Sequence, residues 1–323
     1  MKRAEARIGG IVVALVLFSA APASAYCRST TARDVISGDG CPSYGIPLYW
    51  PSQCVGYRIS EGSTGGIPVA QLSAVVARAF ARWTNPGEVC LPSIDVVALA
   101  PTSNRDIGYE PDRPNVHLIV FRDEPWRYDP MQLEHTTVTF NLATGEILDA
   151  DMEINADVTF GIGGEVSPGD LDLETVLTHG AGHFLGLAHS NEPESVMTPN
   201  IEPGVARQLA PDDAEGICAI YPEDGERVTR DQEGNEVRLP ARTCSFAEPG
   251  GECGPLDIAH GCSIVTRTKG TESPLVALCA VLGLGLASCG RRMRRRPQPV
   301  CGTITTLPSG SIRKRGHCSG LSS

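Results

Sequence analysis

Residues 178–190 have the sequence THGAGHFLGLAHS, and this stretch decides the fold that we expect for the chain. His179 and His183 are four residues apart, so on a helix both imidazoles lie on one face, one turn from each other. Gly186 follows three residues later and can end the helix sharply, because glycine accepts positive φ angles. His189 can then fold back toward the helix. The spacing therefore predicts three imidazoles that converge on one point.

Three neutral imidazoles are a common donor set for Zn²⁺, and they leave a fourth coordination position for water. We therefore predict one catalytic-type zinc site with His179, His183 and His189 as its ligands. A cluster of core or surface histidines is the alternative. The stretch is apolar enough for a buried helix, but a buried helix does not require three histidines at these offsets. No carboxylate completes a facial triad here, which favours zinc over iron.

The same stretch resembles the zinc signature of the metzincin endopeptidases, His-Glu-x-x-His-x-x-Gly-x-x-His. Residues 195–199, SVMTP, resemble the Met-turn of that family, and residues 209–213 with Tyr221 are similar to its matrixin branch. The resemblance covers residues 47–222. It implies an α+β fold with a twisted mixed five-stranded sheet and three helices, in which Met197 lies beneath the histidines. It also implies a zinc endopeptidase that acts on a protein or peptide substrate.

The chain departs from this signature at residue 180, where glycine replaces the glutamate of the family. That glutamate accepts a proton from the zinc-bound water and passes it to the leaving amine, which Gly180 cannot do. The nearby acids Asp172, Glu174, Glu192 and Glu194 do not lie on the matching helix face. The departure predicts an impaired or inactive endopeptidase. A non-catalytic zinc protein that binds peptides, or that keeps zinc for its structure, is the alternative.

Two other groups of residues are weaker candidates for a site. Asp149, Asp151 and Glu153 alternate along an expected strand and so share one face. Such oxygen ligands suit Ca²⁺, but we favour a solvent-exposed strand face. Cys41 is a candidate thiolate ligand that would block the zinc, but we favour a disulfide for it.

The composition limits the partners and the compartment of the protein. The formal net charge of −11 argues against a nucleic-acid partner, because acidic surfaces repel phosphates. Twelve cysteines fit an oxidising compartment. An odd number of them fall in the expected domain, so one is unpaired or pairs with the segment after it: Cys27, Cys41, Cys54, Cys90 and Cys218. Within that segment we expect a bridge between Cys244 and Cys253.

Both ends of the chain resemble targeting segments. Residues 1–25 combine a basic start, an apolar run and a small-residue cleavage site, which is the pattern of a secretory signal peptide. Residues 259–296 combine Cys262, a short apolar run and an arginine cluster, and they resemble the C-terminal sorting tails of myxobacterial surface proteins. That resemblance implies cleavage or lipid attachment at Cys262 and a membrane tether at the cell surface or outer membrane. Residues 297–323 extend beyond such tails and receive no assignment.

Hydrophobic periodicity organises the segment between these ends. It predicts helices over residues 69–84, 171–185 and 211–220. It predicts an edge strand within residues 47–59 and further strands at 96–98, 116–121, 137–141 and 147–155. We therefore expect one domain over residues 26–222, a stalk without periodicity over 223–258, and a monomer.

Overall fold

The computed structural model describes residues 26–32, 41–42, 44–111, 115–123, 125–163, 166–167, 169–244 and 301–305. The expected signal peptide, Cys253, Cys262 and the arginine cluster lie outside these residues. Within the described segments, no helix has the length and apolarity needed to cross a membrane.

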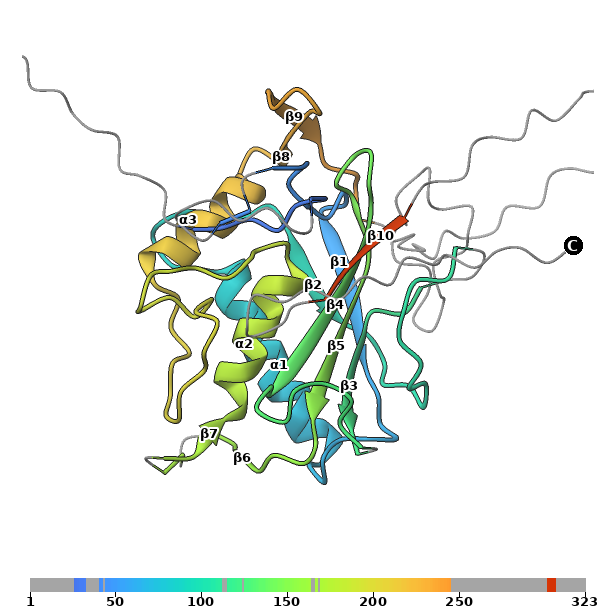
Figure 1. Ribbon diagram of the computed structural model, residues 1–323, viewed down its shortest axis with the longest axis vertical. Helices are drawn as coiled ribbons and strands as arrows, with labels where there is room; N and C mark the ends of the chain where they lie inside the picture. Colours follow the sequence, from blue (N-terminus) through green and yellow to red (C-terminus); the bar gives the residue numbers. More distant parts are fainter. Residues whose placement is uncertain are drawn as a thin grey trace, which may run out of the picture.

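A mixed sheet forms the centre of the molecule, with the strand order β10-β4-β5-β3-β1-β2 (Figure 1). Five of its strands come from the predicted domain: β1 Cys54–Ile59, β2 Asp95–Ala98, β3 Leu118–Arg122, β4 Glu134–Asn141 and β5 Ile147–Asn155. The strands β2, β1, β3 and β5 are parallel, and β4 runs antiparallel to β5. The predicted α+β fold with a mixed five-stranded sheet is confirmed. A sixth strand, β10 Cys301–Thr305, comes from the unassigned tail and pairs antiparallel with β4.

The prediction of an edge strand near the start of the domain was wrong. β1 lies between β2 and β3, and residues 47–50 form only isolated bridges with other segments. Nearly every residue of β1 is buried, which is typical of an interior parallel strand covered on both faces. The edge position on that side belongs to β2, whose residues are partly exposed.

In the part of the chain that the structure describes, three helices accompany the sheet, as predicted: α1 Val69–Thr84, α2 Leu173–Phe184 and α3 Pro211–Ile220. Figure 1 shows α1 and α2 side by side against the sheet. α1 buries one stripe of side chains at helical spacing, which includes Phe80 and Trp83. Every residue of α2 is buried, so this helix lies between α1 and the strands β4 and β5. A short parallel pair, β6 Phe160–Gly161 and β7 Leu171–Asp172, precedes α2.

The segment that we expected to be a stalk is structured through residue 244. It forms an antiparallel hairpin of β8, Glu226–Arg230, and β9, Glu236–Pro240. Arg227 of this hairpin is fully buried, and its guanidinium donates to the carbonyl oxygens of Trp50 and Ser52 at 2.8 and 2.7 Å. A buried arginine is tolerated when backbone acceptors satisfy its donors. The polar composition of this segment therefore suggested exposure, although the hairpin is packed against the domain.

Three disulfides join the described segments: Cys27–Cys41, Cys54–Cys244 and Cys90–Cys218. The first confirms a disulfide for Cys41 rather than a zinc-blocking thiolate. The second contradicts the predicted bridge between Cys244 and Cys253, because Cys244 instead joins the hairpin to β1. It also gives the odd cysteine of the domain a partner in the following segment.

Candidate metal centre

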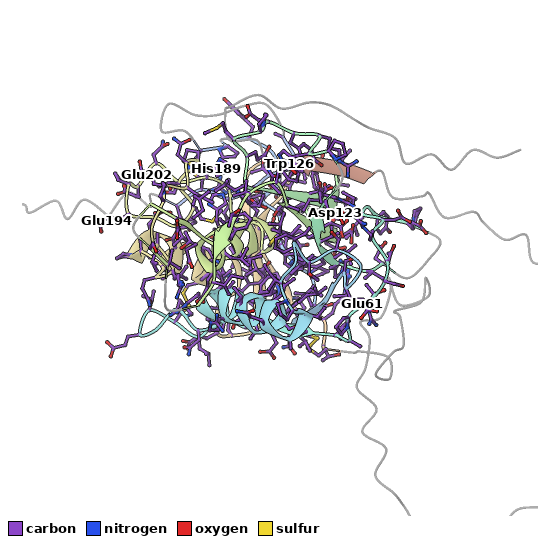
Figure 2. The ribbon with its side chains drawn as sticks, turned by 90° about the horizontal axis from the view of Figure 1, so that it is seen from below. Glu61, Asp123, Trp126, His189, Glu194 and Glu202 are labelled. Atoms are coloured by element: carbon purple, nitrogen blue, oxygen red, sulfur yellow. A yellow bond between two sulfur atoms is a disulfide. The ribbon has the colours of Figure 1, made fainter. Side chains whose placement is uncertain are left out.

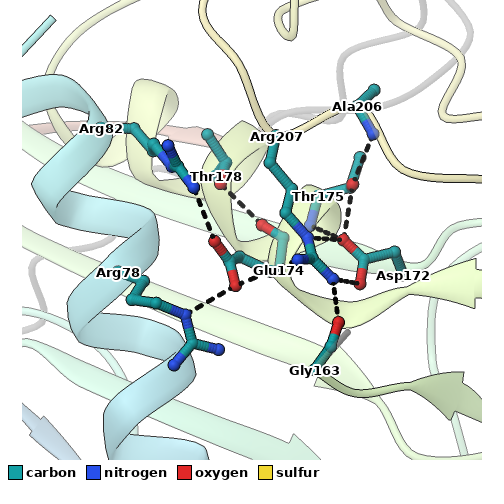
Figure 3. A network of polar contacts seen from close by, with 9 residues as sticks. All are labelled: Arg78, Arg82, Gly163, Asp172, Glu174, Thr175, Thr178, Ala206 and Arg207. Atoms are coloured by element: carbon teal, nitrogen blue, oxygen red, sulfur yellow. Dashed lines mark hydrogen bonds and ion pairs between the residues drawn. The ribbon is translucent and has the colours of Figure 1, made fainter. Parts of the chain in front are cut away.

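The start of α2 is held by a network of charged side chains (Figure 3). Asp172 caps the helix, and its carboxylate accepts from the backbone N–H of Thr175 at 2.9 Å. Arg207 donates to both oxygens of Asp172, at 2.7 and 2.6 Å. Glu174 in the first turn pairs with Arg78 of α1 at 2.8 Å. Acidic groups at a helix N-terminus are favourable, so this network stabilises α2 and fixes it against α1.

The structure brings the three predicted histidines together. The Nε2 atoms of His179 and His183 lie 3.0 Å apart, and the ring of His189 lies 5.2 and 4.8 Å from their rings. One nitrogen from each histidine falls within 4.8 Å of the others. His179 and His183 are buried, whereas His189 is partly buried and lies toward the same edge of the body as Trp126 in Figure 2. Of the three imidazoles, that of His189 is the most exposed to solvent.

Backbone carbonyls orient two of these imidazoles. Nδ1 of His179 donates to the carbonyl oxygen of Val196 at 2.7 Å, and Nδ1 of His183 donates to that of Leu187 at 3.0 Å. A carbonyl oxygen only accepts, so the proton lies on Nδ1 and each Nε2 keeps its lone pair for a metal. Burial lowers the pKa of His179 to about 4 and that of His189 to about 3, and it also lowers the pKa of His183. Neutral imidazoles with free Nε2 lone pairs are the donor set that Zn²⁺ requires.

Gly186 makes the turn that carries the chain from α2 toward His189. Its φ is +99°, and its N–H donates to the carbonyl oxygen of His183 at 3.0 Å. A Cβ atom at this position would lie 3.0 Å from the carbonyl oxygen of Leu48. Both the left-handed backbone and the close carbonyl group of Leu48 therefore require glycine here.

The segment around Met197 is anchored to α3 by an acid that the sequence analysis did not assign. Asp213 accepts from the hydroxyl of Ser195 at 2.5 Å and from the N–H of Val196 at 2.9 Å. Because Val196 in turn accepts from His179, Asp213 supports the first histidine through this segment. Residues 209–213 were noted only for their similarity to the matrixin branch, and no local sequence pattern predicted this role for Asp213.

Met197 packs directly against the helix that carries the histidines. A Cβ atom at Gly182 would lie only 2.3 Å from the sulfur of Met197 and 2.8 Å from the ring of Trp83. The absence of a side chain at Gly182 is therefore what lets the methionine approach the helix next to His183. This close contact gives Gly182 a packing role that its low helix propensity did not suggest.

The interpretation of β5 as a solvent-exposed acidic face was wrong. Asp149, Asp151 and Glu153 are at most 1% exposed. The carboxylate of Asp151 accepts from the N–H groups of Gly108 and Leu118 at 2.6 and 2.9 Å. β5 lies between β3 and β4, and the chain that leads into β3 covers this face. Alternation along a strand shows which residues share a face but not what covers it.

The other two acids of this face also have protein partners. Glu153 pairs with Arg122 and Arg127 at 2.5 and 2.6 Å, and the carboxylate of Asp149 lies 2.8 Å from Nδ1 of His117. Calcium binding at this face stays a prediction.

An acid from another strand lies beside the glycine that replaces the family's glutamate. A Cβ atom built on Gly180 would lie 3.1 Å from Oε2 of Glu134, the first residue of β4. It would also lie 2.8 Å from Cε of Met152 on β5. No pattern near the histidines pointed to Glu134, because this carboxylate comes from a strand that is distant in the sequence.

The comparisons with known proteins agree with this geometry. Residues 49–222, more than half of the chain, match the family model described as matrixin, so the chain belongs to the matrixin family. It is 30% identical over 160 residues to metalloendoproteinase 2-MMP of Arabidopsis thaliana, a match that covers 47% of this chain and 37% of that protein. It is 28% identical over 163 residues to metalloendoproteinase 1 of Glycine max, covering 46% of this chain and 45% of the relative.

A third relative is an animal protein. The chain is 27% identical over 187 residues to matrilysin of Felis catus, which covers 57% of this chain and 64% of matrilysin. The matches therefore span less than two thirds of each of these relatives. Matrixins are zinc metalloendopeptidases, and the described residues hold the histidine triad that a zinc site of this family needs.

Proposed function

We propose that this chain is a zinc-dependent endopeptidase that hydrolyses peptide bonds in a protein or peptide substrate. The observation that carries the proposal is the convergence of His179, His183 and His189, with the Nδ1 atoms of the first two tied to backbone carbonyls. Three such nitrogens hold Zn²⁺ and leave one position open, which is the arrangement of a catalytic site.

Bound Zn²⁺ would polarise the peptide carbonyl and make a water molecule a better nucleophile. The residues of this chain hold and orient that centre. The carbonyl groups of Val196 and Leu187 keep the two helix-borne imidazoles in position, and Asp213 holds the segment that contains Val196. Gly180 places no carboxylate on the helix to move the proton from water to the leaving amine. We therefore expect a lower rate than a helix-borne glutamate would give.

The proposal includes a location outside the cytoplasm. The pattern of residues 1–25 supports export, and Cys262 with its following apolar run and arginine cluster supports tethering at the cell surface or outer membrane. The three disulfides agree with an oxidising compartment. We expect the exported protein to act as a monomer with no nucleic-acid partner, in line with its negative charge.

A second candidate function follows from Gly180 itself. A protein with the same histidines but no proton carrier would bind zinc and hold peptides without cleaving them. The two functions share the metal centre and differ in turnover, so a cleavage assay separates them.

The test uses the exported protein, purified with and without a metal chelator. We expect about one zinc per chain and slow cleavage of an unfolded protein such as casein that the chelator abolishes. His183→Ala should lose both zinc and cleavage. His117→Ala, at a histidine outside the triad, should keep the zinc. Zinc without any cleavage would favour the peptide-binding function, and absence of zinc after reconstitution would refute both.

A further inference from the structure

Glu134 is a buried acid that receives few hydrogen bonds from its neighbours. Its side chain is 6% exposed, and its Oε2 accepts a hydrogen bond from the hydroxyl of Thr136 at 2.9 Å. Within the described segments, no lysine, arginine or histidine forms an ion pair with it. Burial raises its pKa to about 8. A carboxylate in such a place is costly to stability, which makes a functional role worth examining.

Two other buried acids of this fold, Glu153 and Asp172, have more partners than Glu134. Glu153 is bound by Arg122, Arg127 and the hydroxyl of Tyr128, the last at 2.6 Å. Asp172 is held by both nitrogens of Arg207 and by the N-terminus of α2. Both of these acids therefore receive an arginine and further donors. Among the described contacts Glu134 receives one neutral hydroxyl, so its charge is stabilised less than that of Glu153 or Asp172.

Glu134 lies close to the helix position from which the family's glutamate is missing. Its Oε2 lies 3.1 Å from the place where a Cβ atom of residue 180 would be. Standard bond lengths place a glutamate's own carboxylate oxygens about 3 Å from its Cβ. The oxygen of Glu134 thus lies at the distance from this helix position at which a helix-borne glutamate would hold its carboxylate.

We infer that Glu134 supplies, from strand β4, the carboxylate that residue 180 does not supply from helix α2. This inference rests on the proposed endopeptidase function. It also explains Gly180, because a Cβ atom there would press on both Met152 and Glu134. The carboxylate on β4 and the missing side chain at residue 180 therefore belong together: the acid occupies space that a side chain at residue 180 would need.

In the hydrolysis, Glu134 in its ionised form, which predominates above its raised pKa of about 8, accepts a proton from water as the water oxygen bonds to the peptide carbonyl carbon. The electron pair of the C=O π bond moves to the carbonyl oxygen. When this pair re-forms the double bond, the C–N bond breaks and Glu134 returns the proton to the amine nitrogen. The products are a carboxylic acid and an amine, and Glu134 ends in its starting state.

The test compares Glu134→Gln with Glu61→Gln, a matched change at an exposed glutamate, in the complete exported protein. Glutamine keeps the size of the side chain but cannot accept the proton. We expect Glu134→Gln to retain zinc and lose about 10²- to 10⁴-fold in kcat, and Glu61→Gln to match the wild type. The double variant Glu134→Ala with Gly180→Glu returns the carboxylate from the helix and should recover activity. Full activity in Glu134→Gln would overturn the inference.

A second measurement separates this inference from the proposed function. With Co²⁺ in place of zinc, the visible spectrum responds to ionisable groups beside the metal, whether or not the protein cleaves peptides. We expect the pH midpoint of this spectrum to differ between wild type and Glu134→Gln, and to be unchanged in Glu61→Gln. If the midpoints of wild type and Glu134→Gln differ but the wild type cleaves no peptide, the proposed function is refuted while Glu134 remains placed beside the metal. Identical midpoints in all three proteins would refute the role of Glu134.

Discussion

Gly182→Ala is expected to lower the free energy of unfolding by about 2 kcal/mol, although alanine is the better helix former by about 1 kcal/mol. The added Cβ atom would lie 2.3 Å from the sulfur of Met197 and 2.8 Å from the ring of Trp83. Trp83 is fully buried, and its indole N–H donates to the carbonyl oxygen of Thr178 at 2.8 Å, so it cannot move away easily. Overpacking of this kind costs about 1–3 kcal/mol, and the tight contacts here place the cost near the upper end.

Gly180→Ala is the matched comparison on the same helix. Its Cβ atom would meet the Sδ and Cε atoms of Met152 at 3.0 and 2.8 Å, and these atoms are the flexible end of a long side chain. A cost of about 1 kcal/mol would cancel the gain in helix propensity, so we expect almost no net change. Because both variants gain the same propensity, the difference of about 2 kcal/mol between them reports how much tighter the packing of Met197 and Trp83 at Gly182 is than the packing of Met152 at Gly180.

Urea denaturation of the two variants and the wild type measures this difference, provided that the m-values agree. The Gly182→Ala protein should also bind zinc more weakly, because Met197 lies beside the helix that carries the ligands. Equal stabilisation of both variants by about 1 kcal/mol would show that neither glycine is there for close packing, and it would refute the reasoning.

Three further outcomes are expected. Gly180→Glu alone should be less stable than the wild type by about 1–2 kcal/mol in urea titrations, because the atoms beyond its Cβ must fit beside Oε2 of Glu134, which already lies 3.1 Å from that Cβ position; an increase in stability would contradict this. Replacing Cys54 and Cys244 by serine should cost about 4 kcal/mol by the same titration, because the bridge joins residues 190 apart, and a loss below 1 kcal/mol would mean that the hairpin docks without it. Burial raises the pKa of Tyr57 to about 12, so the folded state keeps this proton and stability should fall as pH rises from about 10 to 12. Urea titrations should show that the wild type loses stability over this range relative to Tyr57→Phe, and parallel pH profiles of the two proteins would contradict the assignment.

The helix and the histidine triad were predictable because their signals are local. The spacing of His179, His183 and Gly186 fixes one helix face and one turn, and the bounds of α3 agree with its periodicity. The order of the strands is not local, since it depends on which segments pair across the sheet. The sequence pattern therefore placed β1 at an edge, whereas the structure places it inside.

Burial was the second feature that the sequence did not settle. The alternation of acids along β5 was correct, but the covering chain and the arginines that make Glu153 a buried ion-paired group come from other segments. The same limit applies to Glu134, which reaches Gly180 only because β4 packs against α2. A search of one helix for its missing acid cannot find a carboxylate that arrives from a strand.

X-ray absorption at the zinc edge, on the exported protein after reconstitution, tests the metal centre most directly. We predict about one zinc per chain with three imidazole nitrogens at about 2.0–2.1 Å and a fourth light ligand. His183→Ala should remove this signal. A protein that takes up no zinc, or that binds it through sulfur rather than through His179, His183 and His189, would contradict the assignment.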